Sequence, residues 1–137
     1  MTYARFTVAY WCVLIAALLP YACSYVAKFK AFGKRSDAGG YDNADPRAWL
    51  ARQQGWQARA NAAQANSFEA LPFFIGAVLI AHQTGAAQTR LDILALLFVT
   101  LRIIYAVLYV AGLPTARSAI WALAFLANLG IFLSAWH

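Results

Sequence analysis

Long runs of apolar residues alternate with polar stretches along this chain. A helix of about 20 apolar residues spans the hydrocarbon core of a membrane. Runs of this length cover residues 5–27, the second half of residues 47–83, residues 91–111 and residues 116–136. The pattern predicts a single all-α domain, a bundle of four transmembrane helices, with Pro20 as a kink in the first helix.

The second span is expected to begin well outside the membrane. Asp45 and Pro46 have the form of a helix start, with the aspartate as the cap and the proline at the first helical position. Residues 47–64 carry arginine and glutamine side chains that are too polar for lipid, whereas residues 68–81 are apolar. We therefore expect one continuous helix from Pro46 to about Gln83, roughly 55 Å long, with a polar cytoplasmic extension.

Composition and charge support a membrane protein. Hydrophobic residues make up 63% of the chain and charged residues 12%, too few charges to cover the surface of a soluble domain.

The net charge is +6, and many of the Lys and Arg residues lie in one stretch: Lys28, Lys30, Lys34, Arg35, Arg47, Arg52 and Arg59. The positive-inside rule places loop 28–46 in the cytoplasm and both termini outside. A basic stretch can also bind nucleic acid, but beside membrane helices it is the ordinary topology signal, so no nucleic-acid partner is expected.

Other reactive residue types indicate no separate site. Cys12 and Cys23 lie about 16 Å apart along the first predicted helix, too far for a disulfide, and behave as small hydrophobes. His82 and His137 stand at span ends, and no Cys, His or Asp spacing fits a metal site. The first span lacks a good cleavage site, which favours a retained helix over a signal peptide.

Two groups of polar residues interrupt the apolar runs. Asn66 and Glu69 share a face of the second span, and Arg102, Tyr105 and Tyr109 share a face of the third. Charged side chains at bilayer depth are costly, so they usually pair and face the protein interior. An ion pair of Glu69 and Arg102, with each other or across a subunit boundary, that only holds the helices in register is one interpretation. A ligand site is the other.

Such a ligand site would be positively charged. Arg59, Arg102 and Arg117 contribute three cations near the cytoplasmic half, against Glu69 as the intramembrane acid. This surplus favours an anionic ligand that carries carboxylates. Arg117 and Ser118 open the fourth span, where they could stabilise a thiolate, because a nearby positive charge lowers the pKa of a thiol.

The spacing of these residues resembles that of a known family. Asn-x-x-Glu-x-x-Pro at residues 66–72 is similar to the second-helix signature of the MAPEG family, the membrane-associated proteins of eicosanoid and glutathione metabolism. Arg-x-x-Tyr-x-x-x-Tyr at residues 102–109, followed by Arg117 and Ser118, resembles the family's third and fourth helices. Residues 40–47, Gly-Tyr-Asp-Asn-x-x-Pro-Arg, resemble the loop of bacterial members. The similarity covers nearly the full chain.

The resemblance implies a homotrimer of four-helix subunits in a bacterial inner membrane, with glutathione as co-substrate between neighbouring subunits near the cytoplasmic face. It implies that six residues bind glutathione: Arg59, Asn66, Glu69, Arg102, Tyr105 and Tyr109. It places Arg117, with Ser118, where family enzymes activate the glutathione thiol. The chain departs from the pattern of eukaryotic members at Ala62, where they usually carry a second arginine; Arg59, one turn earlier, matches the first arginine.

These residues lead to the hypothesis of a membrane-bound glutathione transferase or peroxidase that acts on hydrophobic small molecules arriving from membrane lipid. Ala62 keeps a second interpretation open, a non-catalytic protein of the same fold that binds a lipid or a partner membrane protein. A small multidrug transporter also has four spans and an intramembrane glutamate, but there the glutamate usually lies in the first helix and the loops are short. Glu69 in the second span, beside a long first loop, disfavours a transporter.

Overall fold

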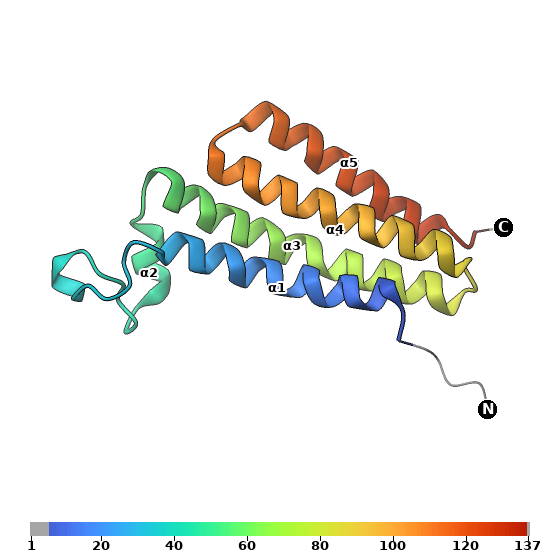
Figure 1. Cartoon of the computed structure of the whole chain (residues 1–137), viewed down its shortest axis with the longest axis horizontal. Coiled ribbons are helices and arrows are strands. Elements are labelled where there is room, and N and C mark those ends of the chain that lie inside the picture. Colours follow the sequence, from blue (N-terminus) through green and yellow to red (C-terminus); the bar gives the residue numbers. More distant parts are fainter. Residues whose placement is uncertain (1–5, 137) are drawn as a thin grey trace.

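Four long antiparallel helices form the molecule, with a small folded segment at one end. The computed structural model describes residues 6–136; Arg5, where the first span is predicted to begin, and His137 lie outside the described residues. The long helices are α1 (Val8–Lys28), α3 (Gly55–Gln83), α4 (Gln88–Ala111) and α5 (Pro114–Leu133), and the 3₁₀ turn η1 (Ser36–Ala38) and the short helix α2 (Pro46–Ala51) lie between α1 and α3 (Figure 1). Each long helix is apolar enough to cross a membrane, which confirms the predicted four-helix transmembrane bundle.

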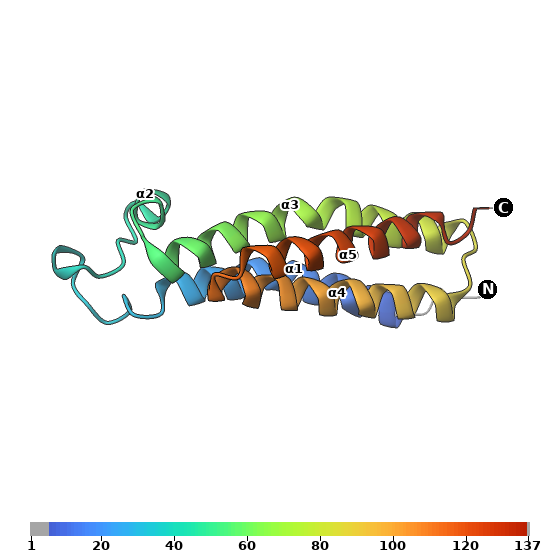
Figure 2. The same ribbon diagram turned by 90° about the horizontal axis from the view of Figure 1, so that it is seen from above.

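The four helices alternate in direction, as predicted. α1 begins and α5 ends at the end of the bundle opposite η1 and α2 (Figure 1). α1 packs mainly on α3 and α5 mainly on α4, while α3 and α4 meet between them. The view turned by 90° shows all four lying nearly along one axis (Figure 2). α1 continues through Pro20 as one helix.

Small side chains fill much of the centre of the bundle. The buried residues of α1 are all Ala, Cys or Pro, and those of α3 are mostly Ala. Small residues let membrane helices approach closely, which strengthens van der Waals packing where no hydrophobic force drives association. Between α3 and α4, the rings of Phe74 and Phe98 stack with centroids 4.2 Å apart. Many large apolar side chains are exposed, as expected for helices surrounded by lipid.

The polar extension of the second span is not continuous with that span. Instead of one helix over residues 46–83, α2 ends and a new helix, α3, begins at Gly55. The side-chain amide of Gln53 donates to the carbonyl oxygen of Trp49 (2.9 Å) and satisfies the end of α2. Gly55 has φ +61, a left-handed conformation that favours glycine. The prediction of a continuous helix was wrong because polar residues 52–54 offer no apolar face to hold a helix, and the glycine after them turns the chain.

Residues 29–54, the basic segment, fold around Tyr41. Its ring lies edge to face with Trp49, which is buried, at a centroid distance of 5.2 Å. The Nζ of Lys28 lies 4.4 Å from the centroid of the same ring, a cation–π contact. A Cβ on Gly40 would overlap backbone carbonyl oxygens earlier in the segment, so only glycine fits there. The segment is therefore a packed structure at one end of the bundle.

At the opposite end, α4 caps α1. The backbone N–H of Ala9 donates to Oδ1 of Asp92 (3.0 Å), and the side-chain amide of Gln88 donates to the same oxygen (2.7 Å). The hydroxyl of Thr7 accepts from the backbone N–H of Tyr10 (3.2 Å). A carboxylate at a helix N-terminus satisfies free N–H groups and complements the helix dipole. Asp92 thus fixes the start of α1 against α4.

Candidate functional site

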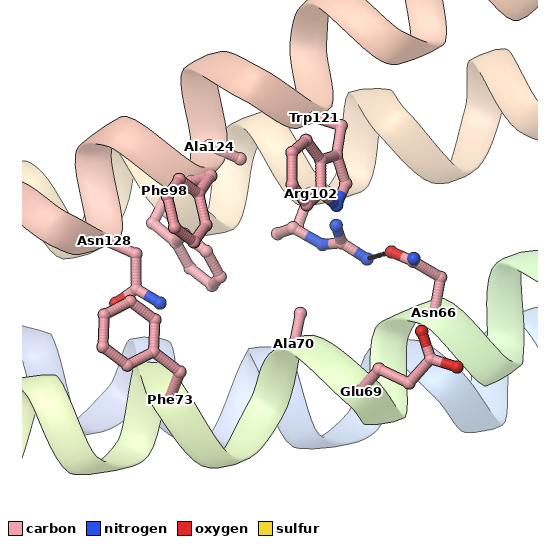
Figure 3. Close-up of a pocket in the computed structure, with 10 residues that line it drawn as sticks. Asn66, Glu69, Ala70, Phe73, Phe98, Arg102, Trp121, Ala124 and Asn128 are labelled. Atoms are coloured by element: carbon pink, nitrogen blue, oxygen red, sulfur yellow. Dashed lines mark hydrogen bonds between the residues drawn. The ribbon is translucent and has the colours of Figure 1, made fainter.

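Arg102 is the charged residue at the centre of the candidate site. It lies midway along α4 and is 3% exposed. Its Nη2 donates to Oδ1 of Asn66 on α3 at 2.7 Å, a bond drawn in Figure 3. A buried guanidinium without a partner would be strongly destabilising. The hydrogen bond therefore explains how Arg102 and Asn66 can both lie within the apolar part of the bundle. It brings together the two polar groups predicted from the sequence.

Within one protomer, the ion pair considered between Glu69 and Arg102 is not formed. Within residues 6–136 the ion pair is between Arg35 and Asp37, both in the basic segment, and Glu69 is exposed on the surface of α3. The pairing within one protomer was wrong because Asn66, on the same face of α3, supplies the acceptor for Arg102; a pair across a subunit boundary stays a prediction. A neutral amide does so without burying a second charge, which would add its own desolvation cost.

A chain of aromatic and cationic side chains continues from Arg102 to the start of α5. The guanidinium carbon of Arg102 lies 4.3 Å from the centroid of the Tyr105 ring. Tyr105 meets Tyr109 edge to face at 5.7 Å, and the guanidinium carbon of Arg117 lies 4.2 Å from the Tyr109 ring. Cation–π contacts of this kind hold a guanidinium in place while its N–H groups stay free to bind a ligand.

These side chains border a polar cavity of about 220 Å³. Its lining comes from three helices: Asn66, Tyr105, Arg117, Ser118 and Trp121. Arg117 is half-buried and Ser118 is exposed. Five predicted site residues therefore gather as the sequence indicates, because Asn66, Tyr105, Arg117 and Ser118 line the cavity and Tyr109 contacts Arg117.

A second pocket, the aromatic pocket, adjoins the polar cavity. Its volume is about 200 Å³, and it lies between α3, α4 and α5 with this lining: Asn66, Glu69, Ala70, Phe73, Phe98, Arg102, Trp121, Ala124, Phe125 and Asn128 (Figure 3). Asn66 and Trp121 line both spaces. A group bound in the polar cavity and one bound in the aromatic pocket would therefore meet at these two side chains.

Arg59 has a different position from the other predicted site residues. Its Nε donates to the carbonyl oxygen of Val110 (2.9 Å), and its guanidinium packs against Gly112, the left-handed residue that ends α4. The cation thus lies at the C-terminus of a helix, where it complements the helix dipole. Arg59 does not line the polar cavity.

Comparison with known proteins places the chain in a family. The family model for the MAPEG family matches residues 8–136, nearly the whole chain. The chain belongs to the MAPEG family. Comparisons with curated proteins and with solved structures gave no match. This MAPEG protein is thus a membrane protein of the family of glutathione and eicosanoid metabolism, as its motifs indicate.

Sequence reasoning missed the aromatic pocket of this MAPEG protein. Trp121, Phe125 and Asn128 follow i, i+4, i+7 spacing and so share one face of α5. Asn128 stands among apolar residues at membrane depth, the same signal that singled out Glu69 and Arg102. That signal could have found Asn128, but nothing in the hydropathy of α5 indicates which face meets α3.

The arrangement suits an anionic, hydrogen-bonding ligand beside an apolar one. Arg102 and Arg117 supply cationic donors, and Asn66 and Tyr105 supply polar groups that accept or donate. The aromatic pocket next to them supplies apolar walls. Within the described residues no group of three His, Cys, Asp or Glu side chains could hold a metal ion. The groups that the site itself offers for chemistry are the charges and hydrogen-bonding atoms of its arginine, tyrosine and asparagine side chains.

Proposed function

We propose that this MAPEG protein is a membrane-bound glutathione transferase or peroxidase that acts on hydrophobic electrophiles. The observation that carries the proposal is the position of Arg117. Its guanidinium lines the polar cavity beside Asn66 and Tyr105, and that cavity shares two side chains with the aromatic pocket. A thiol held in the first space would lie next to a lipophile held in the second.

Glutathione fits the polar cavity by charge. It is an acidic tripeptide with two carboxylates, and arginine binds carboxylates through charge-assisted hydrogen bonds. Asn66 and Tyr105 line this cavity and Tyr109 contacts Arg117 beside it. Arg102 and Glu69 line the adjoining end of the aromatic pocket and would hold the peptide where the two spaces meet. Glu69 and Ser118 are exposed on a single protomer, which agrees with a site completed by the neighbouring subunit of a homotrimer. Arg59, as a residue that binds one carboxylate, would have to leave its bond to Val110 or use its remaining N–H groups.

Arg117 would stabilise the thiolate. Loss of the thiol proton to solvent leaves a negative sulfur, which a guanidinium at hydrogen-bond distance favours by its charge. With an unsaturated carbonyl compound, the sulfur forms a bond to the β-carbon and the C=C electron pair shifts toward the carbonyl oxygen. The resulting enolate then takes a proton from solvent. Ser118, one residue later, would add a hydroxyl donor to the sulfur.

Substitution of Arg117 tests this role. Arg117→Ala should reduce kcat/KM by roughly a hundredfold, the size expected when one preorganised electrostatic donor is lost. The pH–rate profile should move to higher pH, because removing a cation raises the pKa of the bound thiol. Arg117→Lys keeps the charge and should retain part of the activity. The ultraviolet absorbance of the thiolate, recorded with glutathione and purified protein, checks the same change without turnover.

Arg90→Ala provides the matched control. Arg90 lies at the other end of the bundle, where it donates to the carbonyl oxygen of Ser134 (3.2 Å), so its loss should leave the thiolate signal unchanged. A trimeric preparation that binds no glutathione at millimolar concentration would count against the whole proposal. A thiolate signal that survives Arg117→Ala would count against Arg117 alone.

A non-catalytic lipid-binding role is the second candidate. Two observations favour it: Ala62 replaces a family arginine, and Arg59 already bonds to Val110. A further apolar groove of about 410 Å³ runs between α1 and α4, with Leu19, Val26, Val107 and their neighbours along it, and would take an acyl chain. A lipid retained through purification, together with no turnover of standard electrophiles, would favour this candidate over the enzyme.

A further inference from the structure

Asn128 is a buried polar residue whose position the thiolate chemistry does not explain. It lies on α5, is 3% exposed, and its Oδ1 has no hydrogen-bond partner among the described residues. A buried amide oxygen that is left unpaired is destabilising, and native proteins rarely keep one without a reason. Figure 3 shows the Asn128 side chain at the end of the aromatic pocket away from Asn66 and Arg102.

The walls between the two ends of the aromatic pocket are aromatic. Trp121 and Phe125 stack with centroids 5.5 Å apart and planes 9° apart, and Phe73 faces Phe125 at 6.2 Å. These three side chains keep 43%, 45% and 38% of their surface exposed, respectively. The pocket is therefore open at the side between α3 and α5, and flat rings can stack against its walls.

Helix geometry gives the length of a fitting ligand. From Trp121, at the border with the polar cavity, to Asn128 is seven residues of α5, roughly 10 Å along the helix axis. In a molecule whose reacting carbon lies near Trp121, a group about 10 Å from that carbon would thus reach Asn128.

We propose that the aromatic pocket binds the second substrate, and that Asn128 selects aromatic or conjugated lipophiles that carry a hydroxyl group at the end remote from the reacting carbon. A hydroxyl can donate to Oδ1 of Asn128 and accept from its Nδ2 at once. The proposal rests on the proposed function, since it assigns the electrophile to the space beside the thiol site. A site built to bond a hydroxyl rejects the analogue that lacks it, because its own polar group then stays unpaired.

A matched pair of ligands tests the proposal. One ligand is a diaryl enone that carries a hydroxyl on the aryl ring attached to the carbonyl carbon, in the para position. The other ligand is the methyl ether of the same compound, which cannot donate a hydrogen bond. The wild-type trimer should bind the hydroxyl compound roughly tenfold more tightly and turn it over with a correspondingly higher kcat/KM. Asn128→Leu, which keeps the branching of the side chain but has no polar atom, should bring the ratio within about twofold of unity.

Gln64→Leu is the matched control variant. Gln64 on α3 also has a buried side-chain oxygen without a partner among the described residues, but it does not line the aromatic pocket. Its loss should leave the tenfold ratio unchanged. The comparison separates the selection of a ligand from the general effect of removing a buried amide.

Equilibrium binding of the pair, measured without glutathione, separates this inference from the proposed function. A binding preference that depends on Asn128, with no turnover of either compound, would support the pocket assignment while the transferase proposal fails. Turnover of both compounds at equal kcat/KM in the wild type would overturn the role of Asn128 and leave the transferase standing. Equal binding of both ligands, with a less stable Asn128→Leu protein, would also overturn it and identify Asn128 as a structural residue.

Discussion

At the scale of single residues, the bond between Arg102 and Asn66 decides how the bundle tolerates a buried charge. Arg102 has its acceptor on the neighbouring helix and an aromatic ring, that of Tyr105, beside its guanidinium. The bond to Asn66 is lost if α3 and α4 move apart. The pair therefore adds a directional contact that fixes the register of two helices otherwise held by apolar packing.

Removal of Asn66 should be destabilising. Asn66→Ala leaves the guanidinium of Arg102 without its acceptor, and we expect the free energy of unfolding in detergent to fall by about 1.5–3 kcal/mol. In the Arg102→Leu background the same change should cost much less, because there is no charge left to satisfy. Thermal unfolding of the two single variants and the double variant measures the coupling.

Asn43→Ala is the control for this cycle. Asn43 is exposed in the basic segment, and its loss should change stability little. Additive losses from Asn66→Ala and Arg102→Leu would show that the two residues act independently, and the bond between them would then not set the register of α3 and α4.

At the scale of secondary structure elements, the ends of the bundle are held by different means. The basic segment is held by packing of Tyr41 on Trp49, whereas at the other end the carboxylate of Asp92 joins α4 to the start of α1. A cap of this kind joins two elements far apart in sequence, so its effect reaches both α1 and α4.

Loss of the Asp92 carboxylate should loosen the start of α1. Asp92→Ala should lower the free energy of unfolding by about 1 kcal/mol, as the loss of a helix cap usually does. Hydrogen exchange should become faster at the amides of the first turn of α1. Asp37→Ala is the comparison, since Asp37 pairs with Arg35 on the open surface and such pairs contribute little. Equal behaviour of the two variants would contradict the cap.

At the scale of the whole molecule, the basic segment predicts the orientation in the membrane. Positive-inside charge bias predicts that η1 faces the cytoplasm and the turn between α3 and α4 faces outward. A membrane-impermeant maleimide should therefore label Asp37→Cys in inside-out vesicles and Ala87→Cys in right-side-out vesicles. Cys12 and Cys23 are buried and should give little background labelling. The reverse labelling pattern would overturn the predicted topology.

Sequence alone was enough for the number of spans, their alternation and the gathering of polar residues. Runs of apolar residues identify membrane helices because lipid leaves no other way to satisfy the backbone. The partner of Arg102 could not be predicted, because Asn66 and Glu69 share a face of α3 and hydropathy does not choose between them. The break before Gly55 and the face that α5 turns toward α3 were likewise missed. Helices that are apolar all round carry little information about their rotation.

If the aromatic pocket takes the second substrate, as we propose, its sideways opening between α3 and α5 has a consequence for kinetics. When a compound reaches Phe73 and Trp121 from the bilayer, the concentration that governs its binding is its mole fraction in the lipid and not its concentration in water. Adding vesicles at a constant total amount of compound lowers the mole fraction of the compound in the membrane. The total concentration of compound that gives half the maximal rate should therefore rise with the amount of lipid, while the maximal rate stays constant. Among lipophilic compounds of similar reactivity, the partition coefficient into the membrane would then set the order of apparent specificity before any contact with a side chain does.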